Sequence, residues 1–168
     1  EGCTRKQHIY GYSTIDAISL GVCSRAIKPT GALADEYKEK GINISGVHLD
    51  MNVIEQIMVA KAGIYTGICS LVSYAGVEPN LIDNVYIAGG FGFNLNIQNA
   101  VNIGLLPECF LGKIRIIGNT SLKGACMMLS GKLNTPHEID LYNIDVLQLA
   151  NDEKFAEELI NNMSFQRK

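Results

Sequence analysis

The sequence has no tryptophan, few aromatic residues and few charges: 7% of its 168 residues are aromatic and 18% are charged. Average domains carry roughly a quarter charged residues. With 47% apolar residues, this composition excludes a disordered chain, which combines low hydrophobicity with high net charge. A formal net charge of −3 does not favour nucleic acid as a partner, because phosphate backbones are bound by basic surfaces. We expect a folded chain with a sizeable core.

Metal-binding and secretion signals are also missing. The five cysteines form no Cys-x-x-Cys pair and match neither zinc-finger nor ferredoxin spacing. An odd number of scattered thiols is typical of a reducing compartment, and no signal-peptide segment opens the sequence. We therefore predict a cytoplasmic protein whose residues 1–168 bind no metal. The histidines predict no metal or catalytic site, because they lie far apart: they are His8, His48 and His137.

One apolar stretch, residues 57–77, is long enough to raise the question of a membrane span. It contains Gly63-x-x-x-Gly67, a pattern that packs transmembrane helices. Lys61 argues against a span, because a lysine inside a membrane is costly. Small and polar residues also recur there at three- and four-residue spacing: Gly63, Thr66, Gly67, Ser70 and Ser73. This stripe predicts a helix of a soluble protein with one closely packed flank, so we expect no membrane partner.

Glycines, prolines and helix caps divide the N-terminal half into segments. A short helix is expected over residues 11–21, with Ser13 or Thr14 as its cap. Its inner side would carry Ile15, Ile18 and Leu20. Prolines and glycines over residues 28–46 predict a surface loop insertion or an edge hairpin. Asp50 is expected to cap a long helix that ends at Gly76.

Two compact apolar runs in the C-terminal half are too short for helices and predict buried parallel strands, at residues 85–88 and 114–118. Helices are expected over residues 97–104, 120–130 and 153–163, the second capped by Asn119, Thr120 or Ser121 and the last by Asn151 or Asp152, and one more strand over residues 145–150. Alternating helices and strands build a mostly parallel or mixed sheet flanked by helices. We predict an α/β fold and a single domain over residues 1–168.

The predicted strand ends carry the residues most suited to binding a ligand. In open α/β sheets, ligands bind at the carboxyl ends of the strands. The first strand runs into Gly89-Gly90-Phe91-Gly92, where missing Cβ atoms let a ligand approach the main chain. The second runs into Gly118-Asn119-Thr120-Ser121, which is rich in small hydrogen-bonding groups. Nucleotide binding is one interpretation; an ordinary tight turn and an ordinary helix cap are the others. Neither segment is a P-loop or a complete dinucleotide fingerprint.

Asp16 and Lys61 are isolated charges in apolar helical segments. Asp16 is interpreted as a cap or core hydrogen-bonding group, or as a ligand of phosphate or metal. Lys61 is expected to reach the surface along its aliphatic stem, with a role in cofactor binding as the alternative, because its helix leads into the glycine-rich strand. No Ser–His–Asp or Cys–His arrangement is recognisable.

Residues 85–125 carry a more specific resemblance. The segment VYIAGGFGFNLNIQNAVNIGLLP, followed by IRIIGNTSLKGA, is similar to the C-terminal region of the ATP-dependent reductive activators of corrinoid proteins. These belong to the superfamily of acetate and sugar kinases, heat-shock chaperones and actin, and the AGGFG turn resembles its adenosine motif. The similarity extends to the preceding helix and the C-terminal tail, and it is weakest over residues 28–46.

The resemblance implies that residues 1–168 are the C-terminal, adenosine-side lobe of an actin-like ATPase. Such activators use ATP, with Mg²⁺ held by other parts, to drive the reduction of Co(II) to Co(I) in a corrinoid protein. They carry a [2Fe–2S] domain at the N-terminus and act in the one-carbon metabolism of anaerobes. By this resemblance Gly89, Gly90 and Gly92 border the adenosine, with Asn119 and Ser121 nearby. The expected partners are ATP and a corrinoid protein. Whether the chain also forms a homodimer is left open.

The sequence departs from this pattern in three respects. It has no cysteine cluster for an iron–sulfur centre and no Asp-x-Gly phosphate loops, and Tyr12 follows Gly11 where relatives read Gly-Ser-Gly. We therefore expect residues 1–168 alone to be unable to hydrolyse ATP, since phosphoryl transfer needs groups that hold metal and phosphate. Two alternatives remain: a degenerate docking or dimerisation lobe that binds no nucleotide, and a small-molecule kinase of the same superfamily.

Overall fold

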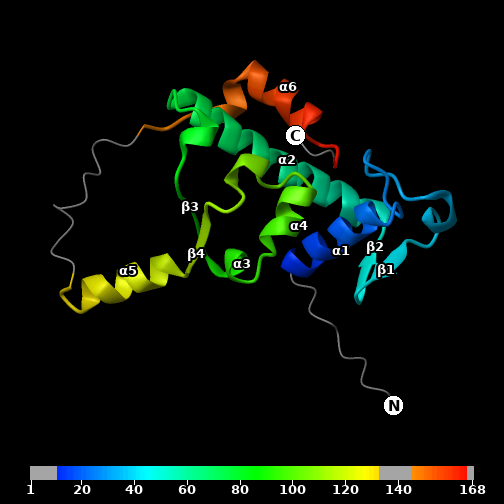
Figure 1. Cartoon of the computed structure of the whole chain (residues 1–168), viewed down its shortest axis with the longest axis horizontal. Helices are drawn as coiled ribbons and strands as arrows, with labels where there is room; N and C mark the ends of the chain where they lie inside the picture. The colour runs from blue at the N-terminus through cyan, green and yellow to red at the C-terminus, as the bar shows by residue number, and fades with distance from the viewer. Residues whose placement is uncertain (1–10, 133–144, 166–168) are drawn as a thin grey trace, which may run out of the picture.

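The computed structural model describes residues 11–132 and 145–165 and has an α/β fold. Its helices are α1 (Gly11–Cys23), α2 (Met51–Tyr74), α3 (Gly90–Phe93), α4 (Ile97–Asn102), α5 (Thr120–Leu129) and α6 (Glu153–Asn161) (Figure 1). Its strands are β1 (Ile42–Ile44), β2 (Val47–Leu49), β3 (Val85–Ala88) and β4 (Ile114–Gly118). Strands β3 and β4 pair in parallel and β1 and β2 pair antiparallel, so the predicted α/β class is confirmed.

The bounds of α2 follow from its two caps, as the sequence predicts. The Asp50 carboxylate accepts a hydrogen bond from the Val53 amide at 2.8 Å, which satisfies one of the free N–H groups of the first turn. At the other end Gly76 has φ +64°, and the Val77 amide donates to the Val72 carbonyl at 3.2 Å. This left-handed closure is a common helix ending, and glycine adopts it without a steric penalty.

The predicted N-terminal helix is present, but its expected cap is wrong. Helix α1 already begins at Gly11, so Thr14 lies inside it and is buried. Ile15 and Ile18 enter the core as expected, whereas Leu20 is 49% exposed. Leu20 lies near the end of α1 and lines a surface pocket together with Tyr37.

Residues 28–46 lead into a hairpin that helps to build the core. Strands β1 and β2 are joined by Ser45 and Gly46, both with positive φ, the conformation of a tight hairpin turn. Val47 and Leu49 of β2 are buried, and so is Leu33 in the segment before the hairpin. Of the two predicted alternatives, the hairpin is therefore present, and it is more than a surface insertion.

A chain of polar side chains ties α1 to α4. The Asn99 amide donates to the Asp16 carboxylate at 2.7 Å and accepts from the Ser19 hydroxyl at 3.1 Å. Asn102 also donates to Ser19, at 3.4 Å. The interpretation of Asp16 as a core hydrogen-bonding group is confirmed. Because Ser19 is 2% exposed, this pairing satisfies a hydroxyl that would be costly to bury alone.

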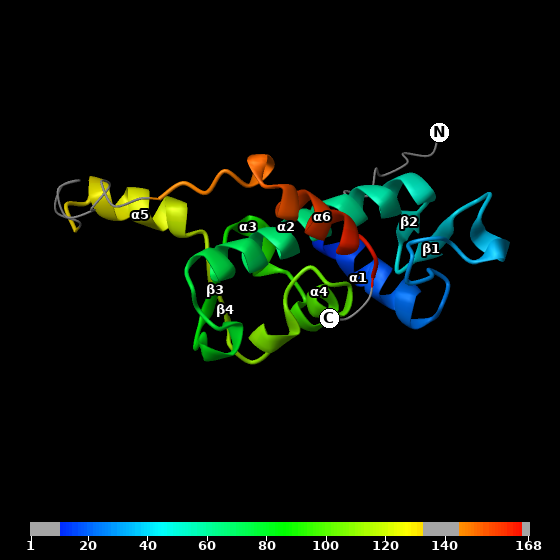
Figure 2. The same ribbon diagram turned by 90° about the horizontal axis from the view of Figure 1, so that it is seen from above.

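The small-residue stripe of α2 packs against the C-terminal part of the chain, a partner that the sequence does not predict. Helix α6 lies along α2 (Figure 2). A Cβ at Gly63 would stand 4.0 Å from Leu159, and one at Gly67 would stand 3.8 Å from Leu149. The buried Thr66 hydroxyl accepts a hydrogen bond from the Asn162 side chain at 3.0 Å. At both glycines a Cβ would make only an ordinary van der Waals contact, so this packing does not itself require glycine.

Lys61 fastens the end of α6 to the same helix. Its side chain is 2% exposed, so the expectation that it reaches the surface is wrong. Its Nζ atom donates to the carbonyl oxygens of Asn162, at 2.6 Å, and of Ser164. It also lies 5.5 Å from the centre of the buried Phe165 ring. The Phe165 amide in turn donates to the Pro29 carbonyl at 2.7 Å.

By length and composition α2 is the one helix of the described residues that is long and apolar enough to cross a membrane. Only 17% of the most apolar window of α2 is buried among the described residues, but the helix carries a buried, hydrogen-bonded lysine and a packed partner helix. The absence of a membrane partner stays a prediction.

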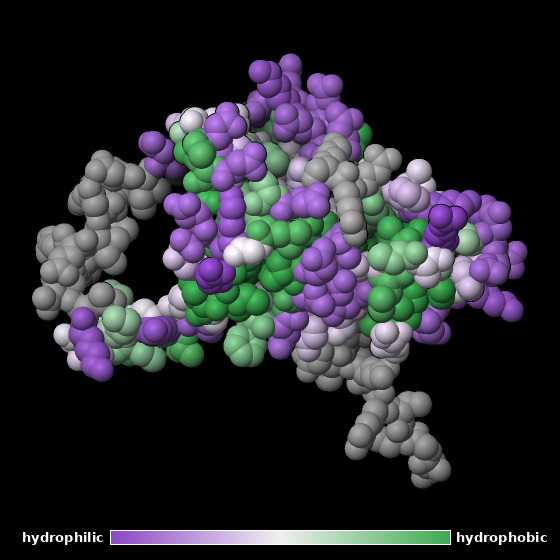
Figure 3. All heavy atoms as spheres, viewed as in Figure 1, coloured by the Kyte–Doolittle hydropathy of each residue, from purple (hydrophilic) through white to green (hydrophobic). Residues whose placement is uncertain are grey.

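The prediction that residues 85–88 and 114–118 are fully buried is wrong. Val85 and Ile87 are half-buried, while Tyr86 is 62% and Ile117 is 45% exposed. A parallel strand is buried only where both faces of its sheet are covered, and the described residues do not cover both faces of this one. Figure 3 shows apolar residues gathered over the middle of one face of the molecule, around β4, α3 and α4.

Residues 145–150 form no strand, contrary to the prediction. Leu149 begins a short 3₁₀ turn and its side chain faces Gly67 of α2. This segment therefore places Leu149 against a helix instead of pairing with a sheet, while Val146 is 73% exposed. Helix α6 then starts as expected, with the Asp152 carboxylate accepting from the Lys154 amide.

Replacing Lys61 should loosen the C-terminal segment. We expect Lys61→Met to lower the free energy of unfolding by about 1–3 kcal/mol, because two carbonyl groups lose their donor. Chemical denaturation measures the loss, and hydrogen exchange at residues 161–165 should become faster. Lys123→Met, at an exposed site in α5, is the control and should change stability by less than about 0.5 kcal/mol. Equal stability of the two variants would contradict the assignment.

Replacing Asn99 should weaken the contact between α1 and α4. We expect Asn99→Ala to cost about 1–3 kcal/mol of unfolding free energy, because Asp16 and Ser19 both lose a partner. Asn94→Ala, at an exposed position, serves as the control in the same urea titration. A loss no larger than that of the control would show that the polar chain contributes nothing.

Candidate functional site

The two predicted strand ends meet in space. Strands β3 and β4 run parallel in the register Val85↔Ile114 through Ala88↔Gly118. Beyond the last pair, the Gly89 amide donates to the Gly118 carbonyl at 2.8 Å. Helices α3 and α5 therefore leave the same edge of the sheet (Figure 1). We call Gly89, Gly90, Gly118 and Asn119 the glycine rim.

The register of the pair shifts just before the rim. Ile87 pairs with Ile116, but Ala88 pairs with Gly118, so Ile117 is the extra residue of a bulge. Bulges strengthen local twist and are frequent beside active sites. Here the bulge brings Gly118, with φ +72°, opposite Ala88.

The three glycines predicted to border a ligand have different roles in the structure. Gly89 has φ +97° and ψ 166°, a conformation that only glycine adopts readily. A Cβ at Gly90 would meet nothing within 4 Å, so open space lies above its main chain. A Cβ at Gly92 would stand 2.3 Å from Cγ2 of Ile87. Gly92 is thus explained by the packing of α3 on β3, and its contact with a ligand stays a prediction.

Asn119 and Ser121 stand at the start of α5, next to the glycines. The Asn119 side-chain oxygen accepts from the Leu122 amide at 3.1 Å, so the interpretation of Asn119 as a helix cap is confirmed. Ser121 is exposed in the first turn. The rim and Ser121 contain no charged side chain. These residues offer a ligand main-chain and neutral polar groups but no side-chain cation.

Lys61 is not directed to the rim. Its ammonium group is held by the carbonyls of the C-terminal segment. Its stem lines a cavity of about 310 Å³ between α1, α2 and α3, together with Phe91 and mostly apolar residues. Lys61 as a cofactor-binding residue stays a prediction that none of these contacts supports.

Other candidate groups form no second site among the described residues. No three histidine, cysteine or acidic side chains lie close enough to hold a metal ion in the described ranges. His48 is exposed on β2, and the other two histidines lie outside those ranges. Cys69 packs beside Tyr65, whose pKa is raised by burial and by that thiol.

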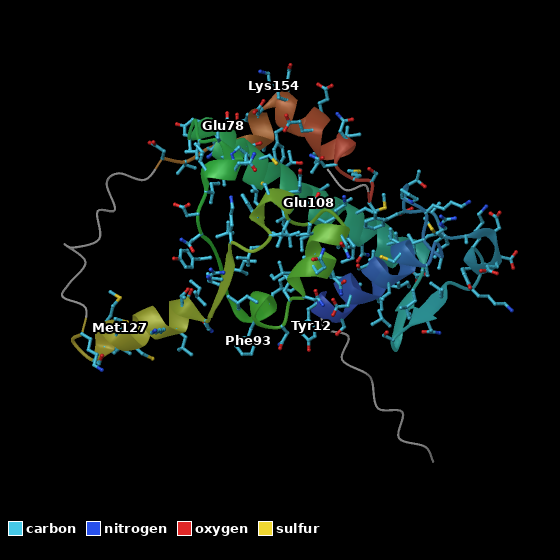
Figure 4. All side chains as sticks on the ribbon, in the orientation of Figure 1. Tyr12, Glu78, Phe93, Glu108, Met127 and Lys154 are labelled. Carbon is cyan, nitrogen blue, oxygen red and sulfur yellow. The ribbon has the colours of Figure 1, made fainter. Side chains whose placement is uncertain are left out.

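The sequence analysis does not single out Phe93, which ends α3 and is 66% exposed. The available signal is its position: an aromatic residue that follows the last glycine of the AGGFG turn. Figure 4 shows Phe93 and Tyr12 at the edge of the molecule where β3 and β4 end, with Glu78 and Lys154 at the opposite edge.

The chain is similar to known proteins in sequence, and to one solved protein in structure. The corrinoid activation enzyme RamQ from Eubacterium limosum is 34% identical over 117 residues, which is 67% of this chain and 19% of RamQ. A solved reductive activator for corrinoid, iron–sulfur protein superposes with a TM-score of 0.75 and 26% identity, over 89% of this chain and 27% of that chain. Translation initiation factor IF-2 from Campylobacter hominis is 29% identical over 99 residues, only 10% of that protein.

The chain thus spans about a fifth to a quarter of the activators it resembles. Its fold is that of a lobe of the actin-like superfamily. A family model described as "C-terminal domain of RACo the ASKHA domain" matches residues 2–168. Because this match covers almost every residue, the chain belongs to that family, as its AGGFG and GNTSL segments predict.

Proposed function

We propose that this chain supplies the nucleoside-binding side of the ATP site in a reductive activator of corrinoid proteins. The observation that carries the proposal is the glycine rim, where two parallel strand ends are held together by the Gly89–Gly118 hydrogen bond. The names of RamQ and of the solved activator support the activity.

The rim offers a ligand accessible main chain and no side-chain cation. Gly90 leaves its main chain accessible, so a flat or bulky neutral group can approach it closely. No lysine or arginine belongs to the rim. We infer that the phosphates and Mg²⁺ of ATP are held by residues outside 1–168, because the sequence has no Asp-x-Gly loop.

In the complete protein, ATP hydrolysis would drive an uphill transfer of one electron to Co(II) of a corrinoid protein, giving Co(I). The electron donor would be a [2Fe–2S] centre held outside residues 1–168, because the cysteines of this chain are scattered. Cytoplasmic location, in an anaerobic organism, belongs to the same proposal. The alternative of a small-molecule kinase would instead show turnover of an acceptor sugar or carboxylate.

A second candidate is a docking or dimerisation lobe that binds no nucleotide. It is favoured by Tyr12, a bulky residue where the family resemblance implies Gly-Ser-Gly, at the same edge of the molecule as Phe93 (Figure 4). Calorimetry separates the candidates: heat on titration of the complete protein with ATP supports the first, and capture of a corrinoid protein without any nucleotide heat supports the second.

Gly90→Val should weaken ATP binding without unfolding the protein. Its side chain would fill the open space above the rim, where we place the nucleoside, and steric crowding of this kind costs about 1–3 kcal/mol, or about 5- to 150-fold in Kd. Isothermal titration of the complete protein measures the change. Gly63→Ala, whose Cβ would make an ordinary contact in α2, is the control. If Gly90→Val binds ATP with unchanged affinity, the glycine rim is not part of the nucleotide site.

Gly92→Ala should act on folding instead. The new methyl group would overlap Ile87, and we expect a loss of about 1–3 kcal/mol in unfolding free energy. Thermal unfolding of Gly90→Ala beside Gly92→Ala tests this division of roles. A Gly92 variant as stable as the Gly90 variant would contradict it.

A further inference from the structure

Helix α5 is a short helix that the other described residues do not cover. None of its 10 residues is buried, and Leu129 is 90% exposed. Figures 1 and 2 both show α5 extending away from the other described elements, beyond the end of β4. An isolated helix of this length is marginal in water, and Gly124 in its interior weakens it further. We therefore expect α5 to need a packing partner.

Three exposed side chains give α5 an apolar stripe. Leu122, Cys126 and Leu129 are exposed, and they follow one another at spacings of four and three residues, which places them on one face of the helix. The helix also matches the neighbouring strand in length. Its 10 residues span about 15 Å, and the five residues of β4 span about 17 Å.

The two faces of the β3–β4 pair differ in what covers them. Ile87 and Ile114 share one face and pack against the core. Tyr86 pairs with Arg115 on the opposite face, and strand alternation places Ile117 there as well. We call Tyr86, Arg115 and Ile117 the outer face. Tyr86 and Ile117 are exposed, although parallel strands are normally covered on both faces of their sheet.

We propose that α5 turns back at Gly118 in the complete protein and packs its apolar stripe on the outer face. Gly118 joins β4 to the helix cap with φ +72°, and residues at the ends of elements commonly absorb the dihedral changes of a hinge. Turning back brings Cys126 level with Tyr86. Cys126 lies about 9 Å along the helix from its start, and Arg115, the partner of Tyr86, lies about 10 Å back along β4 from Gly118.

Both surfaces belong to one chain and are joined directly, which favours α5 as the cover over a second copy or a more distant segment. Covering one leucine side chain favours the closed arrangement about 10- to 150-fold. Because Asn119 caps α5 and belongs to the glycine rim, closure also changes the shape of the rim. Closure needs no nucleotide, so it stands apart from the proposed function.

Chemical cross-linking of the complete protein tests the closure. Cys126 is exposed and supplies one thiol, and Tyr86→Cys supplies the other. We expect a short bismaleimide to join these two thiols within one chain, as identified by peptide mapping. Leu129→Asp in the same protein should slow the linking by as much as about 150-fold, because a carboxylate replaces a covered leucine. Val59→Cys, at an exposed position of α2, is the matched control and should form no link to Cys126.

The products of the reaction decide between the possible covers of the outer face. Ile117→Cys is the second reporter, for the case that Tyr86→Cys does not fold. A link to Cys126 within one chain, slowed by Leu129→Asp, supports the closure. A link formed only between two chains would assign the cover to a second copy, and a link of the new thiol to a cysteine other than Cys126 would assign it to another segment. Either result overturns the closure, as does the absence of any link to Cys126 in both reporter variants.

Discussion

The parallel pairing of β3 with β4 is the constraint on which the candidate site depends. It brings together two strand ends that lie about thirty residues apart in the sequence, and the hydrogen bond from Gly89 to Gly118 closes the pair at the rim. Parallel pairing requires a crossover segment, here residues 89–113, whose helix α4 is fixed to α1 through Asn99. The rim is therefore positioned by the core and not by the loop alone.

Helix α2 is the second organising element, and it connects the distant ends of the chain. Its small residues receive α6, and Lys61 holds the segment that follows α6. Phe165 then contacts the loop at Pro29 through its main chain. The C-terminal residues thus complete the core formed by α1 and the hairpin, and Lys61 holds them to α2.

Local signals predicted much of this fold. Asp50 and Gly76 define α2 because a cap and a left-handed glycine act within one turn, and Asn119 starts α5 for the same reason. The strands were recognisable as short apolar runs between polar turns. Their burial was not, because it depends on what covers the sheet. Residues 145–150 have a strand-like composition, but Leu149 faces α2 instead of a neighbouring strand.

The candidate site was predictable in place but not in detail. Two glycine-rich or polar strand ends indicate a rim once the strands are parallel. The sequence could not separate Gly90, which faces open space, from Gly92, which packs on Ile87, because both occur in one motif. The burial of Lys61 is not predictable from its neighbours in the sequence, because its carbonyl partners lie about a hundred residues further along the chain. The sequence does not show that Phe93 is exposed, because exposure is a property of the folded chain.

Hydrogen–deuterium exchange of the complete protein, with and without a non-hydrolysable ATP analogue, tests the central claim most directly. If the nucleoside binds at the two strand ends, we expect slower exchange in peptides that cover residues 85–93 and 118–122. Exchange in α6 should change little. Binding of the analogue that leaves both of these segments unprotected would contradict the account.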